Sequence, residues 1–234
     1  MWNELTSSEL FGVVLTFVVY LLAQIVYRRS RSMFLNPVAV SIVTIVVLLL
    51  LTGMPYSQYE KGGRLILFLL GPSVVALALP LYRQRHQINS NRWPILIGVF
   101  AGAVASIASA TGIAWLLGGS KEVVLSMAAK SVTTPIAIGI TDKIGGIPEL
   151  TAAIVVLTGC IGAICGPEFC RKIGLKSPTA VGLAVGTASH GIGTARMLEV
   201  DRLSGAVAGL AIGLNGLITA FLLPLIFVLF ELLK

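Results

Sequence analysis

Long apolar runs recur along the whole chain and are separated by short polar loops. An apolar run of about 18 or more residues is the length that crosses a bilayer as a helix. The polar gaps reach only about ten residues, which is too short for a buried soluble core. The pattern therefore predicts an all-α polytopic membrane protein of about seven to eight segments in a single integral membrane domain over residues 1–234. The predicted segments cover residues 10–27, 36–51, 64–82, 93–117, 122–140, 147–165, 178–194 and 204–232.

Two segments contain residues that interrupt a membrane helix. K-S-V-T-T-P-I-A-I-G at 130–139 holds a lysine, three hydroxyls and a proline, and G-T-A-S-H-G-I-G-T-A-R at 186–196 holds glycines, a histidine and an arginine. Proline removes a backbone donor and exposes a carbonyl that lipid cannot satisfy. Both segments are predicted to be discontinuous or re-entrant, and the segment 64–82 carries a similar interruption. The predicted helix breaks are Gly71, Pro72, Pro135, Gly186, Gly191 and Gly193.

An inverted repeat is the second architectural prediction. G-P-S-V-V-A-L-A-L from Gly71 resembles A-K-S-V-T-T-P-I-A-I from Ala129, and each precedes a segment rich in small residues. Inverted repeats with interrupted helices are typical of secondary transporters, which bind substrate where the interruptions meet. The repeat halves would be about residues 1–118 and 119–234.

Composition is that of a membrane protein, and the distribution of charge indicates which loops face the cytoplasm. Residues are 56% hydrophobic and 12% charged, about half the charged share of a soluble domain. The net charge of +7 is concentrated in three loops, and such clusters mark the cytoplasmic side. No nucleic-acid motif accompanies them, so no nucleic-acid partner is expected. The clusters are Arg28, Arg29 and Arg31; Arg83, Arg85 and Arg92; and Arg171, Lys172 and Lys176.

Charge parity favours re-entrance of the segment 122–140. If this segment crossed the membrane completely, the basic loop 171–177 would face outward, against the positive-inside rule. If the segment 122–140 enters and leaves on the same side, the loop 171–177 faces the cytoplasm and the rule is satisfied.

Lys130 is the most informative single residue. An ionisable side chain within an apolar segment is costly unless it faces protein or water, which makes it a functional-site hypothesis. Its position nine residues from Lys121, about 13 Å along a helix, disfavours snorkelling to the interface. Snorkelling and a structural ion pair remain the alternatives.

The two interruptions predict an anionic ligand. Their ionisable groups are Lys130, His190 and Arg196, with no carboxylate among them, and inward helix N-termini would add positive field. The hydroxyls can donate to a substrate, although each can instead bond to its own helix. The predicted substrate-binding residues are Lys130, Ser131, Thr133, Thr134, Thr187, Ser189, His190, Thr194, Arg196 and Asn215.

Alternatives stay open for three of these residues. His190 suits proton coupling or ligand contact, or is a satisfied core histidine. Arg196 either holds a carboxylate or pairs with Glu199, and Asn215 either contacts substrate or joins two helices.

Enzymatic and metal-dependent functions are not expected. Ser189 and His190 are adjacent, which is poor geometry for a nucleophile and its base. Cysteines five residues apart project about 140° from one another on a helix and cannot share a metal. We therefore expect no enzyme activity, no cofactor and no metal, and interpret Cys160, Cys165 and Cys170 as packing residues.

The chain resembles the LrgB/CidB family over essentially its whole length. The motifs that carry the resemblance are K-S-V-T-T-P-I-A at 130–137, I-G-G-I-P at 144–148, G-T-A-S-H-G-I-G-T-A-R at 186–196, G-P-S-V-V-A-L-A-L-P-L-Y at 71–82 and L-N-P at 35–37.

The resemblance implies two functions. Bacterial members are described as antiholin-like proteins linked to autolysis and usually paired with a smaller holin-like LrgA/CidA protein, and some are tied to pyruvate uptake. The plant relative is a plastidial glycolate/glycerate translocator in which an LrgB-like half is fused to an LrgA-like half. The resemblance is to the LrgB-like half alone, so we expect an activity that needs an LrgA-like half to require a separate chain. It also implies localisation in a bacterial inner (cytoplasmic) membrane.

The residues and the resemblance together predict a transporter of small 2-hydroxy or 2-oxo monocarboxylates, proton-coupled through His190. The alternative is an antiholin-like regulator of murein hydrolase export and autolysis that acts with a holin-like partner. Small residues at Gly98, Gly102, Ala105 and Ser109 indicate close helix contact, so a homo-oligomer surrounded by membrane lipid is also expected.

Overall fold

A computed structural model describes residues 8–30, 35–76 and 78–232, and every regular element in these ranges is a helix. The all-α prediction is therefore confirmed. Contacts divide the chain into two compact units, Met1–Leu79 and Pro80–Lys234, which are described separately. Organisation of the chain as one membrane domain stays a prediction. Arg31, which belongs to the first basic cluster, lies outside the described residues.

The first unit contains α2 (Glu9–Ser30), α3 (Pro37–Thr52), α4 (Tyr56–Phe68) and α5 (Leu70–Ala76). Asn36 caps α3, because its side-chain oxygen accepts from the backbone N–H of Val38 at 3.0 Å. The helix α2 packs on α4, where the Thr16 and Tyr59 hydroxyls lie 2.9 Å apart.

The segment predicted at 64–82 differs from the prediction. A helix begins earlier, at Tyr56, and ends at Phe68, and α5 and α6 (Ala78–Arg83) follow as short separate helices. Gly71 and Pro72 lie in the first turn of α5. A proline clashes with the carbonyl four residues before it, here that of Phe68, so the helix stops there.

The second unit contains α7 (Arg85–Ser90), α8 (Arg92–Leu116), α9 (Lys121–Ala128), α10 (Thr134–Ile144), α11 (Pro148–Lys172), α12 (Pro178–Val200) and α13 (Arg202–Leu232). Long apolar helices are α8, α11 and α13 here and α2 in the first unit. These four are long and apolar enough to cross a membrane among the described residues. The total of seven to eight segments stays a prediction.

Helices α9 and α10 form a hairpin, called here the first hairpin (residues 121–144). The backbone N–H of Ile147, which follows α10, donates to Ser126 Oγ in α9 at 2.8 Å. The Thr151 hydroxyl at the start of α11 donates to the Ser126 carbonyl at 3.0 Å. The chain therefore runs back alongside α9 after the turn at residues 129–133. Lys121 at the start of α9 and Ile144 at the end of α10 line the same cavity, so the two ends of the hairpin lie together.

Helix α12 also folds back and is called the second hairpin (residues 178–200). His190 interrupts it with φ 42° and ψ −137°. A methyl group placed on Gly193 would lie 3.0 Å from Val185 Cγ1, although eight residues of straight helix span about 12 Å. The Ser204 hydroxyl, just beyond the hairpin, donates to the Pro178 carbonyl at its start at 3.0 Å.

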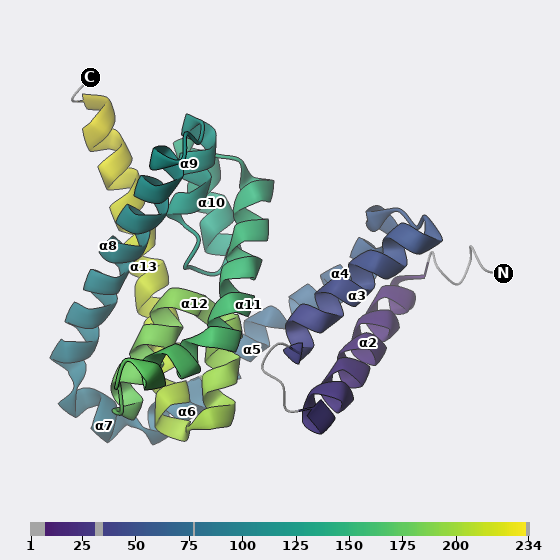
Figure 1. Cartoon of the computed structure of the whole chain (residues 1–234), viewed down its shortest axis with the longest axis horizontal. Helices are drawn as coiled ribbons and strands as arrows, with labels where there is room; N and C mark the ends of the chain where they lie inside the picture. The colour runs from purple at the N-terminus through teal and green to yellow at the C-terminus, as the bar shows by residue number, and fades with distance from the viewer. Residues whose placement is uncertain (1–7, 31–34, 77, 233–234) are drawn as a thin grey trace. The chain divides into compact units, whose positions relative to one another are not determined.

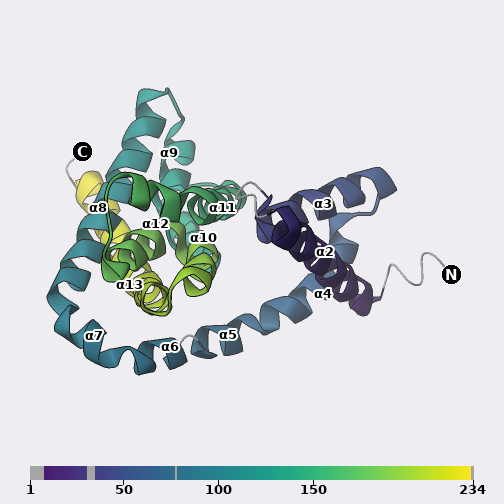
Figure 2. The ribbon, with the colours of Figure 1, turned by 60° about the horizontal axis from the view of Figure 1, so that its bottom comes forward.

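The hairpins enter the second unit from opposite ends (Figures 1 and 2). Gly98 of α8 faces Leu183, and one turn later Gly102 faces Thr187, so α8 and the first half of α12 run parallel. The second hairpin therefore starts at the N-terminal end of α8, while the first starts at its C-terminal end. Long helix followed by hairpin thus occurs twice, in α8–α10 and in α11–α12. The predicted halves 1–118 and 119–234 stay untested.

Candidate functional site

The tips of the two hairpins meet at Asn215 of α13. The side-chain amide of Asn215 donates to the backbone carbonyl of Ser131 at 2.9 Å and to that of Thr187 at 3.1 Å. Asn215 is only 1% exposed. One residue thus satisfies two carbonyls that the helix interruptions would leave without a partner. We call this region, formed by Ser106, Lys130, Ser131, Thr187, His190 and Asn215, the tip junction.

Lys130 is held in the tip junction by hydroxyl groups. Its ammonium donates to Ser106 Oγ at 3.2 Å and to Ser131 Oγ at 3.0 Å, and the two hydroxyls lie 2.8 Å apart. The side chain is half-buried. Ion pairs in the described part of the chain join Arg64 to Glu60, Arg171 to Glu168 and Arg196 to Glu199, and none includes Lys130. The junction thus presents a positive charge that no described carboxylate compensates.

His190 lies at the tip of the second hairpin with its imidazole ring buried. Nε2 is 2.8 Å from the Val155 carbonyl of α11. Because a carbonyl only accepts, Nε2 carries the hydrogen, and Nδ1 is the ring atom left to take up or release a proton. Gly159 of α11 makes room for the ring: a methyl group there would lie 2.6 Å from Cε1.

Two buried hydroxyls of the second hairpin have no hydrogen-bond partner in the described part of the chain, those of Thr187 and Thr194. These residues are 5% and 1% exposed. An unsatisfied buried hydroxyl costs about 1–3 kcal/mol. Ser189 is also buried and packs directly on Gly162 of α11. The second hairpin therefore offers donors that a bound oxyanion or hydroxy group would satisfy.

The structure places the other predicted residues as follows. Thr133 is the N-cap residue of α10 without a side-chain capping bond, and Thr134 and Pro135 form the first turn of α10. Arg196 pairs with Glu199 at 3.0 Å. It lies six residues past the second tip, about 9 Å along the helix, so its alternative as a loop charge paired with Glu199 agrees with the structure.

The predicted glycine breaks differ in what surrounds them. Gly186 packs against the backbone of Ala208 and Gly193 against Ser189, while Gly191 follows the tip and has open space beside it. The residue with non-helical torsions is His190. The glycines thus permit close packing around the reversal.

Sequence reasoning missed Ser106 and the carbonyl of Val155. Ser106 lies one turn after Gly102, on the small-residue face of α8 that contacts the second hairpin. That spacing is a signal that could have found it. The role of Val155 is carried by its backbone, so no residue type at that position would have marked it.

Comparison with known proteins identifies relatives across nearly the whole chain. The model of the LrgB-like family matches residues 16–229. The "Uncharacterized protein YxaC" of Bacillus subtilis strain 168 is 37% identical over 219 residues, covering 94% of this chain and 95% of that protein.

Relatives named "Antiholin-like protein LrgB" match over a similar length. Those of Bacillus mycoides strain KBAB4 and Bacillus cereus strain B4264 are each 32% identical over 221 residues, covering 94% of this chain and 96% of theirs. No solved structure matches. The family resemblance drawn from the motifs is confirmed: this multi-pass helical membrane protein belongs to the LrgB-like family.

Proposed function

We propose that the chain transports small 2-hydroxy or 2-oxo monocarboxylates, such as glycolate, glycerate or pyruvate, across a bacterial inner (cytoplasmic) membrane. One observation carries the proposal: Lys130, at the meeting point of two interrupted helices, is bonded to two serine hydroxyls and paired with no described carboxylate. A small anion at this position would supply the missing negative charge, and Lys130 would exchange neutral hydroxyl acceptors for an ionised acceptor.

The residues would divide the work of binding. Lys130 would hold the carboxylate, and the unsatisfied Thr187 and Thr194 hydroxyls would donate to the substrate's hydroxyl or keto oxygen. His190 would couple transport to a proton through Nδ1, because Nε2 is engaged by Val155. We assign the chain no enzyme activity and no cofactor.

The opposed hairpins support a transport mechanism. Arg92, Arg171, Lys172 and Lys176 lie at the end where the second hairpin enters, so the positive-inside rule makes that end cytoplasmic. The first hairpin would then be re-entrant from outside and the second from inside. We interpret α8–α10 and α11–α12 as inverted repeats, whose alternate opening would expose Lys130 to either side.

Uptake of labelled glycolate, glycerate and pyruvate into proteoliposomes tests the proposal. Lys130→Met should reduce apparent affinity about ten- to hundredfold, the effect of losing one hydrogen bond to a charged group. Lys143→Met, at the exposed base of the same hairpin, is the matched control and should transport normally.

Failure of the proposed binding site and failure of the proposed transport function would give different results. Normal uptake by Lys130→Met would place the anion site elsewhere. Absence of uptake of all three acids by the unaltered protein, with and without a holin-like partner, would refute transport.

The second candidate is an antiholin-like regulator of autolysis that acts with an LrgA/CidA-like membrane partner. The names of the antiholin-like relatives favour this candidate, so the comparisons support it more directly than they support transport. Exposed apolar side chains on α8 and α13, including Phe100, Leu217 and Phe221, would contact lipid, the partner or a second copy.

Lysis measurements separate the two candidates. Cells that express the holin-like partner should lyse less when they also express this chain, if it is antiholin-like. Equal protection by Lys130→Met and the unaltered protein would assign regulation to surfaces outside the tip junction. Protection that vanishes with Lys130→Met would tie regulation to the anion site.

A further inference from the structure

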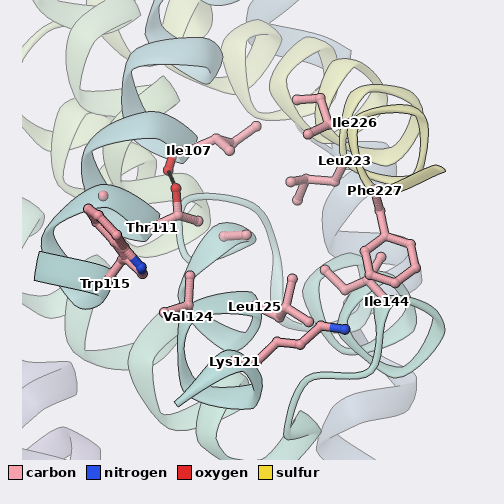
Figure 3. Close-up of a pocket in the computed structure, with 12 residues that line it drawn as sticks. Ile107, Thr111, Trp115, Lys121, Val124, Leu125, Ile144, Leu223, Ile226 and Phe227 are labelled. Carbon is pink, nitrogen blue, oxygen red and sulfur yellow. Dashed lines mark hydrogen bonds between the residues drawn. The ribbon is translucent and has the colours of Figure 1, made fainter. Parts of the chain in front are cut away.

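A cavity that no tip-junction residue lines lies between the C-terminal turns of α8, the base of the first hairpin and the C-terminal half of α13. Its volume is about 490 Å³, within the range of roughly 300–1,000 Å³ typical of small-molecule sites. Figure 3 shows Ile107, Leu125, Leu223 and Phe227 pointing into it from three helices. No function described above uses this cavity.

The cavity wall is apolar apart from one charge. Thr111 is a lining residue, but its hydroxyl donates to the Ile107 carbonyl at 2.8 Å. Among the lining residues that the structure describes, Lys121 is the only charged one, and its ammonium lies 5.9 Å from the centre of the Phe227 ring. The neighbouring Glu122 carboxylate accepts a hydrogen bond from Ser120 and lies outside the lining. The site therefore suits a molecule with a long apolar part and an anionic end.

The position of the cavity near the ends of the helices indicates that such a molecule would enter from the membrane. The cavity borders Trp115, one residue before the end of α8, and Trp115 is 70% exposed. An exposed tryptophan and a lysine at the end of an apolar helix are typical of the membrane–water interface. At this depth an open apolar cavity would take its occupant from the acyl layer of the bilayer, and the lysine would meet the lipid headgroups.

We propose that this cavity binds one acyl chain of an anionic phospholipid, with the lipid phosphate at Lys121. The chain would pack between α8, α13 and Leu125 of α9, and would brace the base of the first hairpin. The charge selects anionic over zwitterionic lipid, since a single lysine favours phosphate that no choline or ethanolamine neutralises. The proposal stands whether the protein transports an anion or regulates lysis.

Photo-crosslinking in nanodiscs tests this site. The full-length protein is placed in phosphatidylcholine discs that contain a trace of phosphatidylglycerol or phosphatidylcholine with a diazirine near the end of one acyl chain. We expect phosphatidylglycerol to label the lining residues of α9 and α13 preferentially, as mapped by peptide mass spectrometry. Lys121→Gln should lower this labelling about fivefold, the effect of one basic residue near a membrane surface.

Lys143→Gln is the matched control, because Lys143 is an exposed lysine at the same hairpin base and does not line the cavity. It should leave the labelling unchanged. Leu125→Trp, which fills the cavity, should abolish labelling by both lipids while thermal unfolding in detergent reports an intact fold. If Leu125→Trp does not fold, Val124→Phe fills the same cavity from the same helix.

Three results would each overturn the proposal. Equal labelling by the two lipids in the unaltered protein would remove the charge selection. An equal loss of phosphatidylglycerol labelling in Lys121→Gln and Lys143→Gln would show that the labelling depends on the general surface charge and not on Lys121. Rapid reaction of Leu125→Cys with a membrane-impermeant thiol reagent, in a variant without the native cysteines, would identify a water-filled cavity instead of a lipid site.

Discussion

His190 combines a favourable side-chain environment with an unfavourable backbone conformation. Its ring is buried, bonded to the Val155 carbonyl and packed on Gly159. Its φ of 42° and ψ of −137° are torsions that glycine tolerates and that cost a residue with a β-carbon about 1–3 kcal/mol. The imidazole contacts hold this conformation in place, which indicates that a histidine at the reversal serves more than chain geometry.

Substitution of His190 separates the two contributions. His190→Gly and His190→Ala lose the same hydrogen bond, but only alanine keeps a β-carbon at positive φ. We expect the glycine variant to be more stable than the alanine variant by about 1–3 kcal/mol, measured by thermal unfolding of the full-length protein in detergent. An alanine variant as stable as the glycine variant would show that the backbone at residue 190 is unstrained.

At the scale of elements, close packing of α12 on α13 brings the tip junction together. Gly182 lies against the backbone of Ser204, and one turn later Gly186 lies against that of Ala208. Small residues four positions apart let two helix backbones approach closely. The close approach continues toward Asn215, which reaches the carbonyl of Thr187 across the same interface.

Two alanine substitutions test this interface. A methyl group on Gly186 would lie 2.6 Å from Ala208 backbone atoms, which cannot rotate away. Gly186→Ala should therefore destabilise the fold by about 1–3 kcal/mol or more. Gly209→Ala, one residue beyond Ala208 and with open space beside it, should be neutral or stabilise by up to about 1 kcal/mol. Urea or thermal unfolding in detergent measures both, and equal stabilities would argue against tight α12–α13 packing.

At the scale of the molecule, the second unit carries two hairpins that start from opposite ends and share one contact residue. The first is anchored at its base by Ser126, Thr151 and Ile147, and the second by Ser204 and Pro178. Each hairpin is fixed where it enters and meets the other at Asn215. Under the transport function proposed above, one hairpin would move to open its own end while the other stays in place.

Cysteine accessibility tests this arrangement in the membrane. In a variant lacking Cys160, Cys165 and Cys170, single cysteines at Ser120 and Lys143 should react with an impermeant reagent from the same side. A cysteine at Lys176 should react from the opposite side, because it lies where the second hairpin enters. Labelling of residues 120 and 143 from opposite faces would mean that the segment between them crosses the membrane.

Local sequence patterns by themselves determined the structural class, the interrupted segments and the family of this protein. Apolar run lengths predicted the helical membrane class, the proline and glycine motifs located both interrupted segments, and the motifs of 130–137 and 186–196 identified the family. These properties are local, because span length, proline chemistry and motif identity are each written within one stretch of chain. The sign of the proposed ligand also came from residue types alone.

Only the tertiary structure decided how the two interruptions are joined. Asn215 bonds to carbonyls 84 and 28 residues away, and no periodicity in the sequence relates such distant positions. The structure likewise supplied Ser106 as a partner of Lys130, paired Arg196 with Glu199, and replaced the single segment 64–82 by short helices. Which helix faces meet depends on the packing of small residues far apart in the chain. The sequence therefore determined the helices and their interruptions, and only tertiary packing decided which residues form the site.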